Sequence, residues 1–163
     1  MLKRPFTLVL IVLTAMQLSS CKKSKTKFTD ITETDSFGTT IGNIDDTDWK
    51  SREEWTRKEK KLFSDFDSYD FDCGSEFGIV AYPNPSWNGV YNFNFNNFNL
   101  QNITVKLVDE KLNILYTATF DQTWSFSLTI LQHFTGVEGN LRLYYVAKDM
   151  SGCYYNGHGD LSL

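Results

Sequence analysis

From residue 77 to its C-terminus the sequence alternates between apolar and polar side chains in short stretches, and this alternation limits the fold more than any other feature. The clearest example is 124–130, Trp-Ser-Phe-Ser-Leu-Thr-Ile, where every even position is apolar. Successive side chains of an extended strand point to opposite faces, so such a stretch forms a strand with one buried face. The pattern therefore predicts β structure for the C-terminal half of the chain.

Seven stretches of this kind follow one another, with turn-forming residues between them. They cover residues 77–82, 90–95, 103–108, 114–120, 124–130, 141–147 and 153–155. Short strands at this spacing are typical of an antiparallel β-sandwich. The stretch is long enough for one domain of ordinary size.

The segment 81–89, Ala-Tyr-Pro-Asn-Pro-Ser-Trp-Asn-Gly, separates the first two predicted strands. Pro83 and Pro85 have no amide hydrogen and hold φ at about −65°, which suits the exit from a strand and not its interior. Asn88-Gly89 favours a left-handed turn before the next strand. We interpret the segment as a corner of the fold, with Trp87 at its tip as a candidate ligand contact.

Tyr82-Pro-Asn-Pro85, with Asn88-Gly89 a few residues later, resembles the opening of the type IX secretion C-terminal sorting domains of Bacteroidetes. Those domains are small Ig-like β-sandwiches whose first strand ends in a Y-P-N-P turn. The resemblance covers roughly residues 77–163. It implies that residues 73–163 form a mainly β, Ig-like antiparallel β-sandwich, and that the chain comes from the same bacterial group.

The N-terminus has the features of a secretory signal peptide over residues 1–20. Lys3 and Arg4 precede the apolar run 6–16, which is shorter than the roughly 20 residues that a membrane-spanning helix needs. Leu18-Ser-Ser-Cys21 follows and resembles the lipobox of bacterial lipoproteins. The resemblance makes Cys21 the lipidated (palmitate-bearing) first residue of the mature chain, and membrane lipid its first partner.

The charge of the mature chain bears on its partners and its location. Removing residues 1–20 takes away two basic residues and no acidic one, so the net charge changes from −4 to −6. Such an acidic chain has no general affinity for nucleic acid. Its basic cluster, the four lysines in 22–27, lies next to the lipid anchor, where it would contact anionic headgroups. The lipobox resemblance implies an outer-membrane lipoprotein. Surface export of lipoproteins in Bacteroidetes looks to favour acidic residues just after the cysteine, so the resemblance together with this basic start favours the periplasmic face over the cell surface.

Residues 21–47 are polar and have few apolar anchors, which predicts a disordered, lipidated tether. Over 48–72 we expect one short helix and an acidic linker. Ser51-Arg-Glu-Glu54 fits a capping box, and Trp55, Leu62, Phe63 and Phe66 share one stripe at helical spacing. We predict a helix over about 52–65 whose stripe packs on a larger surface, followed by solvated carboxylates in 65–72.

The aromatic content raises the question of a ligand site. The chain has 25 Phe, Tyr and Trp residues, more than the core of one small sandwich needs, so some should be exposed. Exposed rings could stack on sugars or contact a protein. Trp87, Tyr91 and Trp124 are the candidate ligand contacts, although strict alternation in 90–95 favours a core position for Tyr91.

Catalytic and metal signals are weak. His158 and Asp160 would share one face of a strand, which permits a hydrogen bond, but an ordinary polar strand end is the favoured interpretation. The histidines lack a metal-ligand spacing, and no cofactor motif is present. We expect no enzyme, metal or cofactor.

Three functions remain open. The first is a membrane-anchored, non-catalytic binding or scaffold module that holds an envelope protein. The second is a glycan-binding lipoprotein beside polysaccharide-uptake machinery, and the third is an envelope hydrolase that uses His158 and Asp160.

Cys73 and Cys153 are predicted to form a disulfide, because an exported chain meets an oxidising compartment. The alternative is two separate buried thiols. Closing a loop of this length would stabilise the fold by roughly 4.5 kcal/mol in the chain-entropy model. Reduction of the purified protein should therefore lower its melting temperature by several degrees, whereas an unchanged melting curve would show that the two cysteines are not joined.

Overall fold

The structure, a computed structural model, describes residues 28, 30–51, 53–72, 77–96, 99–130 and 139–163. Signal peptide 1–20, Cys21 and Cys73 lie outside the described residues. The lipidation of Cys21 and the pairing of Cys73 with Cys153 therefore stay predictions.

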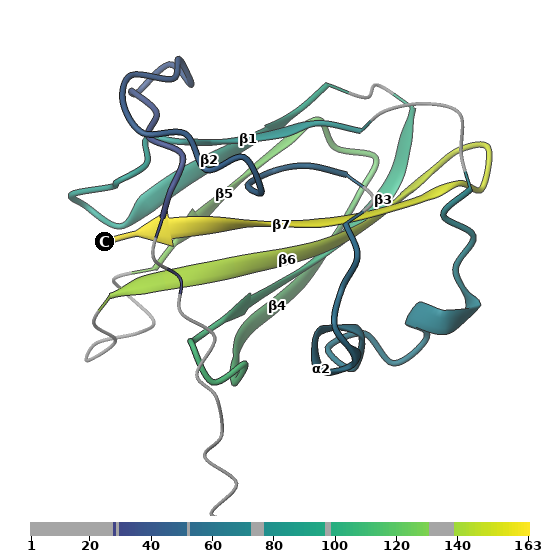
Figure 1. Ribbon diagram of the computed structural model, residues 1–163. Helices are drawn as coiled ribbons and strands as arrows, with labels where there is room; N and C mark the ends of the chain where they lie inside the picture. The colour runs from purple at the N-terminus through teal and green to yellow at the C-terminus, as the bar shows by residue number, and fades with distance from the viewer. Residues whose placement is uncertain (1–27, 29, 52, 73–76, 97–98, 131–138) are drawn as a thin grey trace, which may run out of the picture.

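The described chain is a sandwich of two antiparallel sheets (Figure 1). One sheet has the order β1-β2-β5, with β1 at Ile79–Tyr82, β2 at Val90–Phe95 and β5 at Ser125–Thr129. The other has the order β4-β3-β6-β7, with β4 at Ile114–Asp121, β3 at Leu100–Val108, β6 at Asn140–Asp149 and β7 at Tyr154–Ser162. The predicted mainly β sandwich is confirmed.

The strand order is that of an Ig-like sandwich, except for the sheet to which the fourth strand belongs. If the strands are lettered A to G along the chain, the sheets are A-B-E and D-C-F-G. The constant-type immunoglobulin domain instead places strand D beside strand E, so here the fourth strand has moved to the second sheet. The two sheets pack through the apolar face of each strand.

The core lies between the sheets and follows the period-2 pattern. Tyr91 and Phe93 from β2 are fully buried, as are Val105 from β3 and Leu143 from β6. Aromatic rings contribute a large part of it: the rings of Phe93 and Phe126 are stacked with centroids 4.5 Å apart. The face that alternation assigns to the interior is therefore the buried one.

β7 is longer than the sequence pattern suggested, because it reaches Ser162 while only 153–155 was predicted to be strand. Asn156-Gly-His-Gly-Asp160 has no apolar alternation, but pairing with β6 from Asn140 to Lys148 keeps it extended. Gly157 and Gly159 take the inward positions. A Cβ atom on Gly159 would overlap the ring of Trp49, so glycine makes room for that indole.

β7 is also an edge strand, and residues 48–51 and 53–72, here called the covering segment, bond to its free edge. The amide of Trp49 donates to the carbonyl of His158 (2.6 Å), and the amide of Asp160 donates to Asp48 Oδ1 (2.8 Å). Further along, the amide of Tyr154 donates to the carbonyl of Asp70. Three backbone groups that an open edge would leave exposed are thus bonded to the covering segment.

The Tyr82–Pro85 loop ends β1 as predicted and also joins the two sheets. Both X-Pro bonds in it are cis. The side chain of Asn84 is fully buried: its Nδ2 donates to the carbonyl of Asp160 (2.8 Å), and its Oδ1 accepts from the amide of Ser162 (3.0 Å). Asn84 therefore connects the β1–β2 corner to the end of β7.

Residues 30–47 differ from the disordered tether that their composition predicts. Thr34 exchanges two backbone hydrogen bonds with Asn84 (2.8 and 3.1 Å), and its hydroxyl donates to the carbonyl of Ala81 (2.7 Å). Phe28 is buried as well. Hydrogen bonds to a distant part of the chain hold this segment, and composition does not reveal such bonds.

The predicted helix over 52–65 is wrong in extent. Helix α2 spans only Arg57–Lys60, and its capping box uses Thr56 and Glu59 instead of Ser51 and Glu54. In a straight helix Trp55 and Phe66 would lie about 16 Å apart along the axis. Their ring centroids are only 4.8 Å apart, because the chain turns back on itself after α2.

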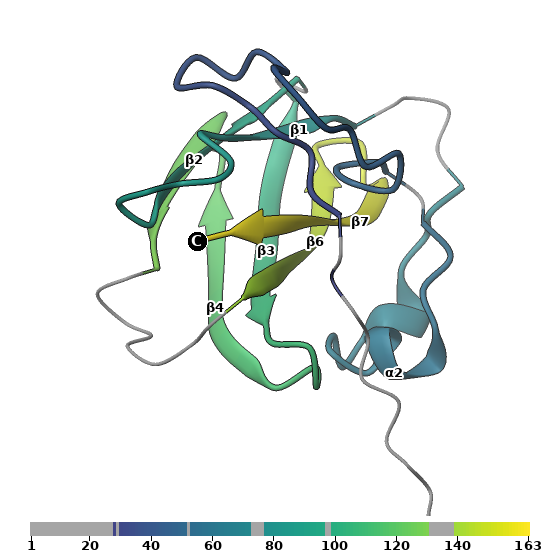
Figure 2. The same cartoon turned by 60° about the vertical axis from the view of Figure 1, so that its left-hand side comes forward.

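The predicted docking of the aromatic stripe is confirmed. Trp55, Leu62, Phe63 and Phe66 are all buried, and they form a cluster with Tyr144 and Val146 of β6. This cluster covers the outer face of the four-stranded sheet. In two views 60° apart, α2 lies on the side of the domain away from β1 and β2 (Figures 1 and 2). The carboxylates at 65, 67, 70 and 72 are exposed, as expected for the acidic linker.

Two tryptophans allow a matched test of this docking. Trp55 is buried, with 5% of its surface exposed, whereas Trp124 is 70% exposed. Trp55→Ala should lower the free energy of unfolding by about 3–5 kcal/mol, because it leaves a cavity under the covering segment. Trp124→Ala should change it by about 0.5 kcal/mol or less. Urea denaturation of both variants measures the difference, and equal losses would contradict the docking.

Candidate functional site

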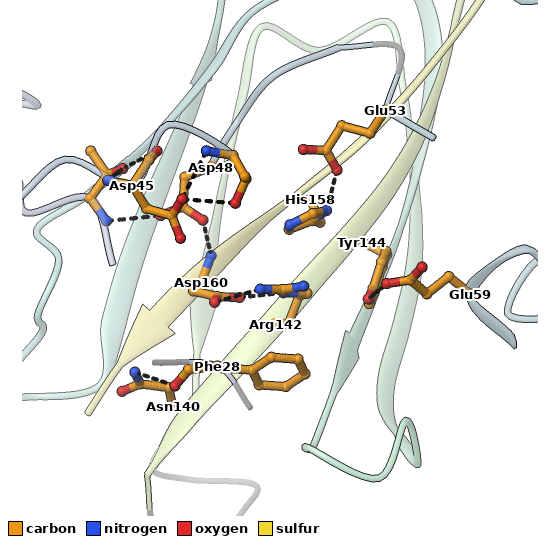
Figure 3. Close-up of polar contacts among 12 residues, drawn as sticks. Phe28, Asp45, Asp48, Glu53, Glu59, Asn140, Arg142, Tyr144, His158 and Asp160 are labelled. Carbon is orange, nitrogen blue, oxygen red and sulfur yellow. Dashed lines mark hydrogen bonds and ion pairs between the residues drawn. The ribbon is translucent and has the colours of Figure 1, made fainter. Parts of the chain in front are cut away.

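Ionisable side chains gather on the outer face of β6 and β7, underneath the covering segment (Figure 3). In the strand register Arg142 lies opposite Asp160, and Tyr144 lies opposite His158. The same alternation that directs Leu143 and Leu161 into the core directs these four side chains outward. The arrangement is therefore a direct result of strand pairing.

Arg142 and Asp160 form a bidentate ion pair. Nε donates to Oδ1 at 2.5 Å and Nη2 donates to Oδ2 at 2.7 Å. Burial alone would lower the pKa of Arg142, but the hydrogen bonds and charge of Asp160 raise it above its ordinary value. Burial raises the pKa of Asp160, and the guanidinium opposes that rise. The ring of Phe28 lies 4.5 Å from the guanidinium carbon and shields the pair.

His158 and Tyr144 each have a carboxylate partner from the covering segment. His158 Nδ1 pairs with Glu53, and the Tyr144 hydroxyl donates to Glu59 Oε1 at 2.6 Å. Burial raises the pKa of Glu59, but the hydrogen bonds from Tyr144 and Thr56 bring it below its ordinary value. Burial and the nearby carboxylate raise the pKa of Tyr144. These contacts tie the covering segment to the sheet.

Three carboxylates, from Asp45, Asp48 and Asp160, lie close enough together to suggest a metal site, with one oxygen of each within 4.8 Å of the others. Both oxygens of Asp48 accept backbone amides, from Asp160 and Thr32. Both carboxylate oxygens of Asp160 accept hydrogen bonds from Arg142, and Asp45 Oδ1 accepts a hydrogen bond from the amide of Thr47. A cation would have to displace these donors, so the cluster is better explained as a hydrogen-bonded junction.

The sequence correctly predicted that His158 and Asp160 share a face, but the two side chains do not bond to each other. His158 turns to Glu53, and Asp160 turns to Arg142. Both are buried under the covering segment. The predicted hydrolase pair therefore has no hydrogen bond between its members.

The three candidate ligand contacts are not brought together. Tyr91 is wrong as a contact, because its position in the alternation places it in the core, where its hydroxyl donates to the carbonyl of Ser162 at 2.5 Å. Trp87 and Trp124 are 90% and 70% exposed. Trp87 lies close to Gly89, just before the start of β2, and Trp124 bonds to Phe95 at the end of β2. The two ends of this six-residue strand are about 20 Å apart. The two tryptophans do not form one aromatic row.

A cleft of about 360 Å³ lies on the outer face of the four-stranded sheet beside this network. Its floor consists of Asn102, Thr104 and Lys106 from β3, Thr117 from β4, Val146 and Lys148 from β6, and Tyr154 from β7. Phe63, Ser64 and Tyr69 of the covering segment form its roof. We call this the lysine cleft. Its volume falls within the range of small-molecule sites, roughly 300–1,000 Å³.

The two lysines are held at the edges of the cleft by neutral groups. Lys106 Nζ donates to the carbonyl of Leu62 at 2.6 Å and lies 5.1 Å from the centroid of the Phe63 ring. Lys148 Nζ lies 5.4 Å from the centroid of Tyr154, whose ring is stacked on Tyr69. Within the described part of the chain, neither ammonium has a carboxylate oxygen within 4.0 Å. Both charges are therefore open to an anionic ligand.

The lysine cleft was missed at the sequence level. Lys106 is the outward residue of an alternating strand and looks like an ordinary solvated position. Only the fold places Ser64 and Tyr69 over it, and nothing in the local sequence predicts that contact.

Comparison of the chain with protein families, curated proteins and solved structures found no match. In the described residues, no helix is both long and apolar enough to cross a bilayer. The interpretation of the site therefore rests on its geometry.

The junction at Asp48 has a pH dependence that can be measured. Burial raises the pKa of Asp48 from 3.8 to about 6 in the folded state. Between these values the folded state binds more protons than the unfolded state, so the free energy of unfolding falls as the pH rises. Asp48→Asn cannot titrate, so its stability relative to the wild type should improve as the pH rises from about 4 to about 6.5.

Urea denaturation of the two proteins at both pH values measures this change. Asp46→Asn is the matched control, because Asp46 is the exposed neighbouring carboxylate. A constant difference between Asp48→Asn and the wild type would contradict the raised pKa.

Proposed function

We propose that this chain is an outer-membrane lipoprotein of the bacterial cell envelope whose β-sandwich is a non-catalytic binding module. The observation that carries the proposal is the lysine cleft. It is a roofed cavity of ligand size, and its two cations have no carboxylate partner among the residues that the structure describes. A cavity with a few directed polar groups is the usual form of a binding site.

The pairing of the ionisable groups supports a non-catalytic role. A general base must lie within hydrogen-bond reach of the proton that it removes. His158 is engaged by Glu53 and Asp160 by Arg142, and both lie beneath the covering segment. A hydrolase that used His158 and Asp160 would have to break both pairs before substrate could enter.

The proposed anchor is supported by the Leu18-Ser-Ser-Cys21 motif and by the short connection that follows it. Phe28 is already packed beneath Arg142, only seven residues after Cys21. Seven residues span at most about 25 Å, so a lipid on Cys21 would hold the domain close to the bilayer. The lysines at 22, 23, 25 and 27 would then lie at the headgroups.

Glycan binding is the second candidate, because aromatic rings and hydrogen-bonding side chains line the same cleft. Tyr69 and Tyr154 stack at one end, and Asn102, Thr104 and Thr117 lie on the floor. Sugars offer apolar ring faces and hydroxyl groups that match such a lining.

Lipidation and binding can be tested together on two forms of the chain. The wild-type protein should incorporate an alkyne analogue of palmitate and sediment with the outer membrane. Cys21→Ser should lose the label and leave the membrane fraction. Label retained by Cys21→Ser, or a membrane-free wild type, would contradict the proposed anchor.

Affinity capture from detergent-solubilised envelopes then tests the binding role. Both forms should recover the same protein or glycan, because the binding surface lies in the sandwich and not in the lipid. If neither form retains a protein or a glycan, the binding module is contradicted.

A further inference from the structure

We propose that the lysine cleft binds an acidic oligosaccharide, with Lys106 and Lys148 each contacting a carboxylate or sulfate group. This inference rests on the proposed function, since it names the ligand class of the same binding module. The placement of the two charges, the lining between them and the strands on which they lie all favour this ligand class.

The two lysines lie at opposite ends of the cleft. Lys148 is opposite Asn102 in the register of β3 and β6, and Asn102 is four residues from Lys106. At about 3.4 Å per residue the two Cα atoms are therefore about 14 Å apart. Lys106 leans toward Phe63 and Lys148 toward Tyr154. One small anion cannot contact both ends, whereas an elongated ligand with repeated anionic groups can.

Acidic residues border the cleft without neutralising it. Asp121 lies opposite Asn102 on β4, and Asp65 follows Ser64 in the roof. The hydroxyl of Ser64 lies 3.3 Å from Asp65 Oδ2, which binds that carboxylate to the roof. The ammonium groups thus keep their charge available inside a chain whose formal net charge is −4.

A second hollow extends the basic surface beyond the roof. It has a volume of about 520 Å³, and its charged lining residues are Arg57, Lys60, Lys61 and Asp67 of the covering segment. Phe63 and Ser64 line both hollows, so the two adjoin. Together the two hollows carry five cationic side chains and one carboxylate, so their lining has a positive net charge that attracts a polyanion.

The lining between the lysines favours a sugar. The amide of Asn102 and the hydroxyls of Thr104 and Thr117 offer both donors and acceptors, which suits a ligand rich in hydroxyl groups. Thr104 already shares a hydrogen bond of 2.9 Å with Thr119, which holds its hydroxyl in place. The stacked rings of Tyr69 and Tyr154 supply an apolar wall.

The strands beneath the cleft argue against an acidic peptide. Extended peptides are commonly bound by addition to an open sheet edge, where main-chain hydrogen bonds provide affinity. β3 and β6 are both internal strands, paired on either side. Their backbone groups are paired with the neighbouring strands, so the part of the floor that β3 and β6 form offers a ligand only side chains.

The shape of the cleft argues against a bilayer surface. Lys106 and Lys148 are half-buried on the floor, below the roof formed by Phe63, Ser64 and Tyr69. A flat layer of headgroups would contact the exposed cations of α2 first.

Isothermal titration calorimetry on the full chain in detergent tests the proposal. The probes are oligomers of galacturonic acid and a heparin-derived oligosaccharide, with glucose oligomers as the neutral control. Polyglutamate and phosphatidylglycerol vesicles represent the other acidic partners. At least one acidic oligosaccharide should bind, and the neutral sugar should not. Lys148→Met should weaken binding about tenfold or more, because a charge-assisted contact is lost.

Lys106→Met should have a similar effect, and Lys111→Met is the matched control, since Lys111 is exposed in the β3–β4 turn outside the cleft lining. If Lys106→Met lowers the melting temperature through loss of the bond to Leu62, Lys148→Met decides, because among the described residues Lys148 contacts the ring of Tyr154 and makes no hydrogen bond in the cleft.

The proposal is overturned if no acidic oligosaccharide binds or if the neutral sugar binds equally. It is also overturned if polyglutamate or the vesicles bind in preference, or if the cleft variants behave like Lys111→Met. Palmitate labelling of the same preparation separates the two proposals. A labelled protein that captures an envelope partner but binds no acidic oligosaccharide contradicts only this inference.

Discussion

The edge of β7 is the constraint on which the rest of the structure depends. An edge strand presents unpaired amides and carbonyls along its open side. Asp48 and Trp49 bond to its middle, and Asn84 bonds to its end. Because these partners come from the N-terminal segment and from the β1–β2 corner, satisfying one strand brings three distant parts of the chain together.

The fold was largely predictable from the sequence where burial alone decides the structure. Strands β1 to β6 follow from alternation, since each has one face in a common core. Prediction failed where hydrogen bonds determine the structure. Residues 156–162 of β7 have no apolar rhythm and are held by pairing with β6. Thr34 lies in a polar segment whose composition predicts a tether, yet two backbone hydrogen bonds join it to Asn84.

The candidate site was predictable only in part, for a related reason. The alternation of side chains along a strand correctly placed His158 and Asp160 on one face and Tyr91 in the core. Alternation does not predict which part of the chain packs on that face. The covering segment occupies it, and its path depends on a chain reversal after α2 that stacks Trp55 on Phe66. No local pattern encodes that reversal, so the roof over Lys106 could not be anticipated.

The covering segment performs two tasks that are physically linked. Its aromatic residues fill the outer face of β6, and the same packing positions Ser64 and Tyr69 over the cleft. Lifting it away would cost free energy, because the amide of Asp160 would lose Asp48 at one end and the hydroxyl of Tyr144 would lose Glu59 at the other. Leaving a buried polar group without its partner costs about 1–3 kcal/mol, and more for a charged group. The paired network thus holds the roof at a fixed height, so a ligand meets a cleft that is already formed and loses little binding energy to ordering it.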